Sequence, residues 1–204
     1  MRRSGVLSAA AVCTALLAFS GLQAQTPSKK ADASSPKKVE RGKYLVSILA
    51  CGDCHSPKKM GPNGPEEDPA RLLMGHPEGA KVQPLPKLAD TPWIAATNGD
   101  MTAWTGPWGV SYAINLTPDE NTGIGSWSEA TFIGAIRTGK HMGASRPILP
   151  PMPWPAYRNL SDEDLASIYA YLRTIKPMHN RIPDPEPPAA APPSAAASAK
   201  PAKR

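Results

Sequence analysis

Proline is the residue type that most restricts how this chain can fold. The sequence has 25 prolines among 204 residues, about 12% of the chain, where average usage is roughly 5%. Each internal proline removes a helix hydrogen bond and clashes with the preceding turn, which excludes a bundle of long helices. Proline also lacks the amide hydrogen that a strand ladder needs, which disfavours a large regular sheet.

The N-terminus has the composition of a secretory leader. Arg2 and Arg3 precede an apolar run over residues 6–19, and a small-residue Leu-Gln-Ala sequence follows at 22–24. These features are typical of a signal peptide, which we assign to residues 1–24. The run is shorter than the ~20 apolar residues of a membrane-spanning helix. The sequence therefore predicts an exported, periplasmic protein, which would be membrane-associated if the leader were retained.

Two polar segments flank a more balanced core. We interpret residues 25–38 as a flexible Lys/Ser/Pro linker and residues 183–204 as a disordered Pro/Ala tail, because neither can bury enough apolar surface to offset its ordering entropy. The core, residues 39–182, contains 14 Lys and Arg against 14 Asp and Glu. The net charge of +6 therefore lies outside the core, and it does not indicate a nucleic-acid partner.

Three segments of the core have helical periodicity. Residues 39–50 place their apolar side chains on one stripe. Residues 126–138 and 161–175 each open with a serine that is followed three positions later by Glu or Asp, the spacing of a capping box. The sequence therefore predicts helices over these three ranges, with Ser126 and Ser161 as N-caps.

The predicted helices are separated by loops of unusual length. Residues 57–125 and 140–159 are dense in glycine and proline. Loops this long are uncommon in a compact domain that builds its own core. We therefore predict that they wrap a group that is not protein, in a fold that is mainly α with long Gly/Pro-rich loops.

A five-residue motif directly after the first predicted helix identifies that group. Cys51-Gly52-Asp53-Cys54-His55 has the Cys-x-x-Cys-His pattern by which c-type haem is attached. Two thiols three positions apart on one helical turn reach the two vinyl groups and form thioethers, and the next residue brings an imidazole to the iron. We therefore predict one covalently bound haem c, attached at Cys51 and Cys54, with His55 as the proximal iron ligand.

Two other uses of the cysteine pair remain open from the sequence. A thiol–disulfide oxidoreductase would need a thioredoxin-like βαβ frame, and the chain shows no pattern of parallel strands. A structural zinc site would need a second ligand pair at matching spacing, whereas His76, His141 and His179 each stand alone in the sequence. Haem attachment accounts for both the motif and the long loops.

The sixth iron ligand decides between electron transfer and chemistry at the metal. Met152 stands in a proline-rich stretch, residues 148–155, whose prolines enforce an extended path. A stiff loop that presents a thioether suits a fixed axial bond, which raises the reduction potential and closes the iron to small molecules. We predict Met152 as this ligand and keep His141 and Met142 as alternatives.

These features together resemble a class I cytochrome c over residues 39–183. The resemblance rests on Gly42 in the first helix, the haem motif, the proline-flanked Met152, and a closing helix with Ile168, Tyr171 and Leu172. In that family the first and last helices cross, and a glycine on one lets an aromatic side chain on the other approach closely. The resemblance implies a class I cytochrome c fold around one haem, with Gly42 against Tyr171 or Tyr169.

A narrower resemblance points to cytochrome subunits of bacterial membrane-associated dehydrogenases. It rests on residues 115–119 (Asn-Leu-Thr-Pro-Asp), 122–127 (Thr-Gly-Ile-Gly-Ser-Trp) and 151–153 (Pro-Met-Pro). Those subunits usually carry two or three haem domains, whereas this chain has one Cys-x-x-Cys-His motif. The family also implies a proline carbonyl, here that of Pro62, as the acceptor for the N–H of His55, a contact that would tune the basicity of the ligand.

The tryptophans of the middle loop have two interpretations. Trp104 and Trp108 lie close together in the sequence, with Trp93 upstream. Such side chains bury a large area at low entropic cost, which favours packing on the haem face. In the second interpretation an indole or phenol group binds a haem propionate alongside Arg146 or Asn115.

Taken together, the motif, the leader and the proline-flanked methionine predict a periplasmic one-electron carrier with a His/Met-ligated haem. It would pass electrons from a dehydrogenase or quinol-side donor to a respiratory acceptor. Its partners would be redox proteins, a dehydrogenase or an oxidase, and we expect no nucleic acid, no small-molecule substrate and no catalytic residue. The alternative is a peroxidase-like haem enzyme or sensor with an open sixth position, in which His141 and Arg146 would form the distal pair.

Overall fold

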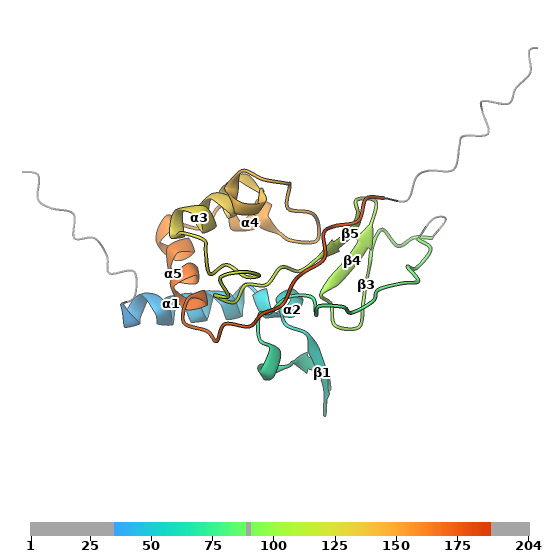
Figure 1. The fold of residues 1–204 in the computed structure, drawn as a ribbon, viewed down its shortest axis with the longest axis horizontal. Coiled ribbons are helices and arrows are strands. Elements are labelled where there is room, and N and C mark those ends of the chain that lie inside the picture. Colours follow the sequence, from blue (N-terminus) through green and yellow to red (C-terminus); the bar gives the residue numbers. More distant parts are fainter. Residues whose placement is uncertain (1–34, 89–90, 189–204) are drawn as a thin grey trace, which may run out of the picture. The chain divides into compact units, whose positions relative to one another are not determined.

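The computed structural model describes residues 35–88 and 91–188, so the predicted leader, most of the linker and the tail beyond residue 188 lie outside the described residues. The described part contains the helices α1 (Pro36–Ile48), α2 (Cys51–His55), α3 (Glu129–Thr138), α4 (Trp154–Tyr157) and α5 (Asp162–Leu172), shown in Figure 1. Its strands are β1 (Lys58–Gly61), β2 (Gly64–Glu67), β3 (Ala96–Thr97), β4 (Ala103–Gly106) and β5 (Gly109–Tyr112). Two 3₁₀ turns complete it, η1 (Pro69–Arg71) and η2 (His141–Gly143).

Helix α1 begins earlier than its apolar period indicates. Ser35 is the N-cap, and its side chain accepts a hydrogen bond from the amide of Lys38 at 3.4 Å. Pro36 occupies the first turn, where a missing amide hydrogen costs nothing. The predicted start at residue 39 is therefore three residues late, and residues 35–38 belong to the helix and its cap instead of the flexible linker.

The core forms where α5 packs across α1 (Figure 1). A Cβ on Gly42 would stand 1.9 Å from the carbonyl oxygen of Ser167 and 2.8 Å from Cβ of Tyr171. The predicted approach of Tyr171 to Gly42 is therefore confirmed. The apolar side chains around this crossing are buried: Leu45, Val46, Leu165, Ile168 and Leu172. Each contributes roughly 1.5–3 kcal/mol of transfer free energy.

Helix α3 starts two residues later than its predicted cap. Ser128, not Ser126, is the N-cap, and its hydroxyl accepts from a backbone amide at 3.0 Å. The intervening Trp127 is buried, and its amide donates to the carbonyl of Ile124, so this stretch belongs to the preceding turn. At the other end Gly139 adopts the left-handed conformation with φ 66°, a common helix stop.

Helix α5 has the predicted N-cap but is shorter than predicted. The Ser161 hydroxyl accepts from the amide of Asp164 at 3.0 Å. The helix ends at Leu172, three residues before the predicted end. The amide and the hydroxyl of Thr174 both donate to the carbonyl of Tyr171, at 2.8 and 2.7 Å. This carbonyl therefore does not accept the hydrogen bond from four residues on that would continue the helix.

Two small antiparallel sheets accompany the helices, so the expectation of a mainly α fold is not confirmed. The hairpin β1–β2 turns at residues 62–63, and β3, β4 and β5 form a three-stranded sheet in that order. Gly64 and Gly109, each at the start of a returning strand, have φ of 114° and 95°, which glycine adopts without steric cost. The strands have four residues or fewer, and Pro65 stands in β2, which pairs on one side only. Proline is tolerated in such an edge strand, which is why the proline content did not exclude these sheets.

A C-terminal segment follows α5 and returns along the sheet. We call residues 177–188 the C-terminal strap. Asn180 is 1% exposed, and its side-chain amide donates to two backbone carbonyls in the 74–76 segment at 2.6 and 2.9 Å. Glu186 exchanges both backbone hydrogen bonds with a residue of β5, and Figure 1 shows the strap beside that strand. The tail predicted from residue 183 therefore starts too early.

Candidate haem site

The Cys-x-x-Cys-His motif forms a helical turn of its own. Ala50, in the left-handed conformation with φ 54°, separates α1 from α2, so the motif starts in a new direction. Both cysteine side chains are partly buried, and Cys51 packs against the apolar core. The structure brings the thiols of Cys51 and Cys54 and the imidazole of His55 onto one turn.

A backbone carbonyl orients the ring of His55. Its Nδ1 donates to the carbonyl oxygen of Ile114 at 2.8 Å, and the residue is 8% exposed. Burial lowers the pKa of His55, so the imidazole is neutral at neutral pH and Nε2 keeps a free lone pair. A neutral imidazole fixed through its other nitrogen is the form that ligates a metal. The prediction of the Pro62 carbonyl as the acceptor is wrong, because the carbonyl of Ile114 takes this place; Pro62 lies in the turn between β1 and β2.

The β1–β2 hairpin packs directly on the motif. Lys58 Nζ donates to the carbonyl of Gly52 at 2.9 Å, and a Cβ on Gly52 would stand 2.1 Å from Oε1 of Glu67. A larger residue at position 52 would therefore have to displace the Glu67 side chain. Sequence reasoning missed this hairpin, although Asn63-Gly64 between oppositely charged flanks is a recognisable hairpin signal.

The environment of the thiols opposes thiol redox chemistry. Burial raises the pKa of Cys51 to about 12 and also raises the pKa of Cys54. Redox-active cysteines have a lowered pKa, because the thiolate is the attacking species. The thioredoxin-like alternative is therefore disfavoured. On the zinc alternative, the described residues contain no group of three or more His, Cys, Asp or Glu side chains that could hold a metal ion.

Met152 packs, partly buried, on the same apolar cluster as Cys51. The helix that follows it, α4, is joined to the attachment region, because the hydroxyl of Tyr157 donates to the carbonyl of Leu49 at 2.5 Å. Met142, one of the alternative ligands, is 50% exposed. Burial therefore favours Met152 over Met142.

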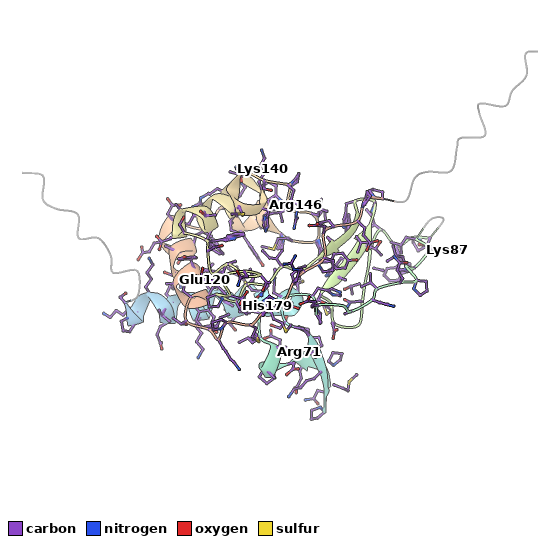
Figure 2. The ribbon with its side chains drawn as sticks, in the orientation of Figure 1. Arg71, Lys87, Glu120, Lys140, Arg146 and His179 are labelled. Carbon is purple, nitrogen blue, oxygen red and sulfur yellow. The ribbon has the colours of Figure 1, made fainter. Side chains whose placement is uncertain are left out.

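The remaining histidines of the described chain differ in what their rings contact. His76 is fully buried, with Nδ1 3.0 Å from the hydroxyl of Thr102 and Nε2 3.2 Å from a backbone carbonyl, so both nitrogens are engaged. His179 is exposed (Figure 2), and its Nδ1 lies 3.8 Å from a carboxylate oxygen of Asp119. His141 lies in a cleft.

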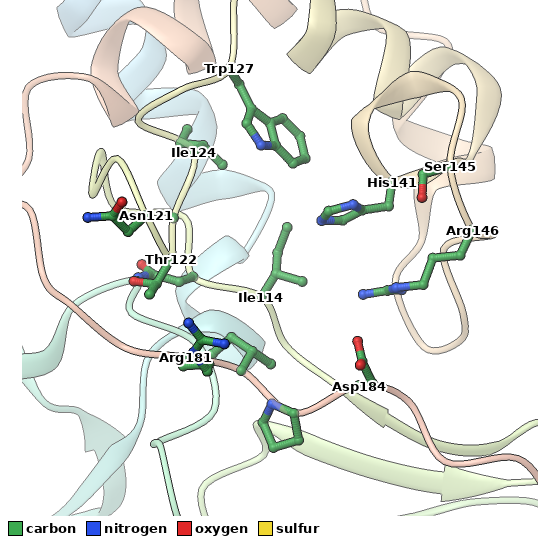
Figure 3. A pocket seen from close by; sticks show the side chains of 14 residues that line it. Ile114, Asn121, Thr122, Ile124, Trp127, His141, Ser145, Arg146, Arg181 and Asp184 are labelled. Atoms are coloured by element: carbon green, nitrogen blue, oxygen red, sulfur yellow. The ribbon is translucent and has the colours of Figure 1, made fainter.

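This cleft, of about 450 Å³, opens beside Ile114, the residue that orients His55 (Figure 3). Its walls combine apolar, aromatic and cationic side chains, among them Ile124, Trp127, His141, Arg146 and Arg181. The rings of Trp127 and His141 meet edge to face with centroids 5.2 Å apart. Burial lowers the pKa of His141, and Arg146 lowers it further. Residues 181–184 of the strap line the cleft too, a contribution that sequence reasoning missed.

The middle-loop tryptophans use their polar groups within the protein. The indole N–H groups of Trp104 and Trp108 donate to protein acceptors at 2.9 and 3.3 Å. The side-chain amide of Asn115, 1% exposed, donates to the carbonyl of Met178 at 2.8 Å. Trp93 is 70% exposed. These contacts support the packing interpretation of Trp104 and Trp108 over propionate binding.

The segment that follows Asn115 is a tightly built turn. The Asp119 carboxylate accepts from the amide and the hydroxyl of Thr122 at 2.8 and 2.7 Å. A Cβ on Gly123 would stand 2.2 Å from the carbonyl oxygen of Thr117, so this backbone approach requires glycine. The turn holds Ile124 in the wall of the cleft (Figure 3).

These residues fit a covalently attached haem. The chain offers two thiols on one helical turn, an oriented imidazole and a partly buried thioether. The cleft beside Ile114 adds the guanidinium groups of Arg146 and Arg181, which suit the carboxylate substituents of a haem, together with the aromatic ring of Trp127. When bound, a c-type haem takes up and releases single electrons at its iron. The fold and the site together define a c-type haem protein.

Comparison with known families gives the same class. The family described as Cytochrome c matches residues 39–176. The match covers more than half of the chain, and the protein belongs to the cytochrome c family. It therefore carries covalently bound haem c.

The chain is similar to cytochrome subunits of bacterial dehydrogenases. It is 32% identical over 181 residues to the fructose dehydrogenase cytochrome subunit of Gluconobacter japonicus, which covers 87% of this chain and 30% of that one. It is 37% identical over 140 residues to the gluconate 2-dehydrogenase cytochrome c subunit of Pantoea cypripedii, covering 69% and 24%. It is 38% identical over 82 residues to the cytochrome c subunit of the quinone-type alcohol dehydrogenase of Gluconobacter oxydans, covering 38% and 17%. The chain spans less than a third of the length of each of these relatives.

Proposed function

We propose that this protein is a one-electron carrier whose single haem c is attached at Cys51 and Cys54 and ligated by His55 and Met152. The observation that carries the proposal is the orientation of His55, whose Nδ1 bond to Ile114 leaves Nε2 free to bind a metal. With two axial ligands from the chain, no position at the metal is left for a substrate, which suits electron transfer and not turnover.

Met152 is the best-supported sixth ligand. It is partly buried on the cluster that Cys51 also contacts, and the prolines around it limit the conformations of its loop. The competing Met142 is half exposed, and both nitrogens of His76 are engaged. His141 remains the competing ligand of the cleft.

A dehydrogenase is the proposed electron donor, and a respiratory protein such as an oxidase is the proposed acceptor. The relatives named above include cytochrome subunits of fructose and gluconate dehydrogenases. The single attachment motif supports one haem, so the chain would do the work of one haem domain of such a subunit.

The periplasm is the proposed location. The leader-like composition of residues 1–24 supports export. Among the described residues, no helix has both the length and the apolar character needed to cross a membrane.

The attachment is tested by the intact mass of the denatured protein. We expect the mass of the chain plus one haem, because two thioethers survive unfolding. Cys51→Ala together with Cys54→Ala should release all haem into acidified organic solvent. Cys13→Ala is the matched control, because the third cysteine of the chain lies in the predicted leader, and it should leave attachment unchanged. Release of haem from the unaltered protein would contradict the proposed thioethers.

One observation favours a second candidate function, that of a peroxidase-like haem enzyme. His141 and Arg146 line the same cleft (Figure 3), and the amide of His141 donates to the carbonyl of Arg146 at 2.9 Å. A neutral imidazole beside a guanidinium can accept and return a proton at a bound substrate. This function requires that Met152 does not bind the iron, so the two candidates differ in the ferric spectrum.

A further inference from the structure

The segment that carries Met152 is anchored on both sides by hydroxyl groups. Before it, Ser111 of β5 donates from Oγ to the carbonyl of Pro150 at 2.5 Å. After it, Tyr157 of α4 donates from its phenol to the carbonyl of Leu49 at 2.5 Å. The two hydrogen bonds bracket the loop in which Met152 lies.

The Tyr157 anchor reaches the backbone that leads into the attachment turn. Leu49 is the C-cap of α1, Ala50 makes the left-handed step, and Cys51 begins α2. One hydrogen bond thus joins the segment of the proposed sixth ligand to the segment of the proposed attachment.

The second anchor, Ser111, lies in strand β5. Ser111 is 8% exposed, and its hydroxyl also accepts from the indole N–H of Trp108 at 3.3 Å, which fixes its orientation. It lies in the strand that leads to Ile114, the acceptor for His55. The loop of Met152 is therefore tied to both chain segments that position the proximal side of the site.

A weak ligand bond depends on such anchors. A thioether is uncharged and binds ferric iron weakly, so the loop must be held in place before the bond forms. A hydrogen bond between protein groups changes an equilibrium by about fivefold on average. We call the Met152 loop closed when the thioether is on the iron and open when it is not. Each anchor should therefore shift the ratio of closed to open loop by about that factor.

We infer that Tyr157 and Ser111 are positioning residues that hold Met152 at a fixed place relative to the Cys51–His55 turn. This inference rests on the proposed ligation by Met152. Neither hydroxyl touches the metal in this role, and both act through the backbone on either side of the ligand.

The test measures how readily added imidazole displaces the sixth ligand of the purified ferric holoprotein. In Tyr157→Phe, and separately in Ser111→Ala, we expect the apparent affinity for imidazole to rise about fivefold, because the loop is open more often. The weak far-red band of methionine-bound ferric haem should persist before imidazole is added. The matched control is Tyr44→Phe, because Tyr44 is 55% exposed and its ring lies beneath Arg41 in a cation–π pair that phenylalanine can keep. It should leave the affinity unchanged.

The outcomes separate this inference from the function on which it rests. Unchanged imidazole affinity in both anchor variants would overturn the positioning role, even if their unfolding midpoints fell, because a merely structural bond alters only the midpoint. If instead Met152→Ala kept the far-red band, the proposed ligation itself would be wrong. A rise in affinity in the anchor variants, together with loss of the band in Met152→Ala, supports both.

Discussion

Met152→Ala is expected to abolish the weak far-red absorption band of the ferric protein and to lower its reduction potential. The band requires a thioether sulfur on the iron, so it disappears with the side chain. A thioether ligand favours the ferrous state and raises the potential. The fall should be on the order of 0.1–0.3 V, a part of the roughly 0.8 V over which axial ligands set haem potentials. Visible spectra and a potentiometric titration of the purified holoprotein measure both effects.

Controls for this variant come from the other methionines. Met60→Ala should change neither the band nor the potential, because Met60 is 79% exposed on the β1–β2 hairpin. Met142→Ala and His141→Ala remove the two alternative ligands, which lie in η2. Both variants should likewise keep the far-red band and the reduction potential. Loss of the band in Met142→Ala, with the band retained in Met152→Ala, would reassign the ligand.

Gly42→Ala is expected to destabilise the protein by about 2 kcal/mol or more. Alanine gains about 1 kcal/mol of helix propensity over glycine. The new Cβ would stand 1.9 Å from the carbonyl oxygen of Ser167, a backbone atom that moves only if α1 and α5 separate. Overpacking costs about 1–3 kcal/mol and occasionally more, and the contact with a backbone atom places Gly42→Ala at the upper end of this range, so the steric loss exceeds the propensity gain. Denaturant unfolding of the holoprotein, followed by circular dichroism, measures the difference.

Gly134→Ala is the matched control for this substitution. Gly134 also lies within a helix, α3, but its new Cβ would meet its nearest atom, in Gly143, at 3.7 Å, an ordinary contact. The same propensity gain should therefore stabilise this variant by up to about 1 kcal/mol. If Gly42→Ala were as stable as Gly134→Ala, the close crossing of α1 and α5 would not limit the stability of the fold.

The sequence predicted those features that depend on a few neighbouring residues. Ser161 caps α5 because its hydroxyl satisfies an amide three positions on. Helix α3 ends at residue 138, as its predicted range does, because Gly139 accepts a left-handed backbone. The turn at Cys51–His55 follows from the motif spacing in the same way. The contact of Gly42 with Tyr171 spans the chain, and it was predicted through the family resemblance and not from local pattern.

Other contacts between distant segments could not be predicted, because neither a local pattern nor the family resemblance indicated them. Ile114 orients His55 from 59 residues away through a backbone carbonyl, and every residue carries such a carbonyl, so no side-chain pattern marks it. The strap presents the same problem, because Asn180 binds backbone carbonyls of the 74–76 segment. The β1–β2 hairpin is different, since its Asn63-Gly64 turn was a local signal that the proline content obscured.

The most direct test of the account is the visible spectrum of the purified ferric protein at neutral pH, followed by the addition of cyanide. Ligation by both His55 and Met152 predicts a low-spin spectrum with the far-red band, and slow cyanide binding that is limited by opening of the Met152 loop. A high-spin spectrum with rapid cyanide binding would contradict the electron-carrier account and favour an open site beside His141 and Arg146.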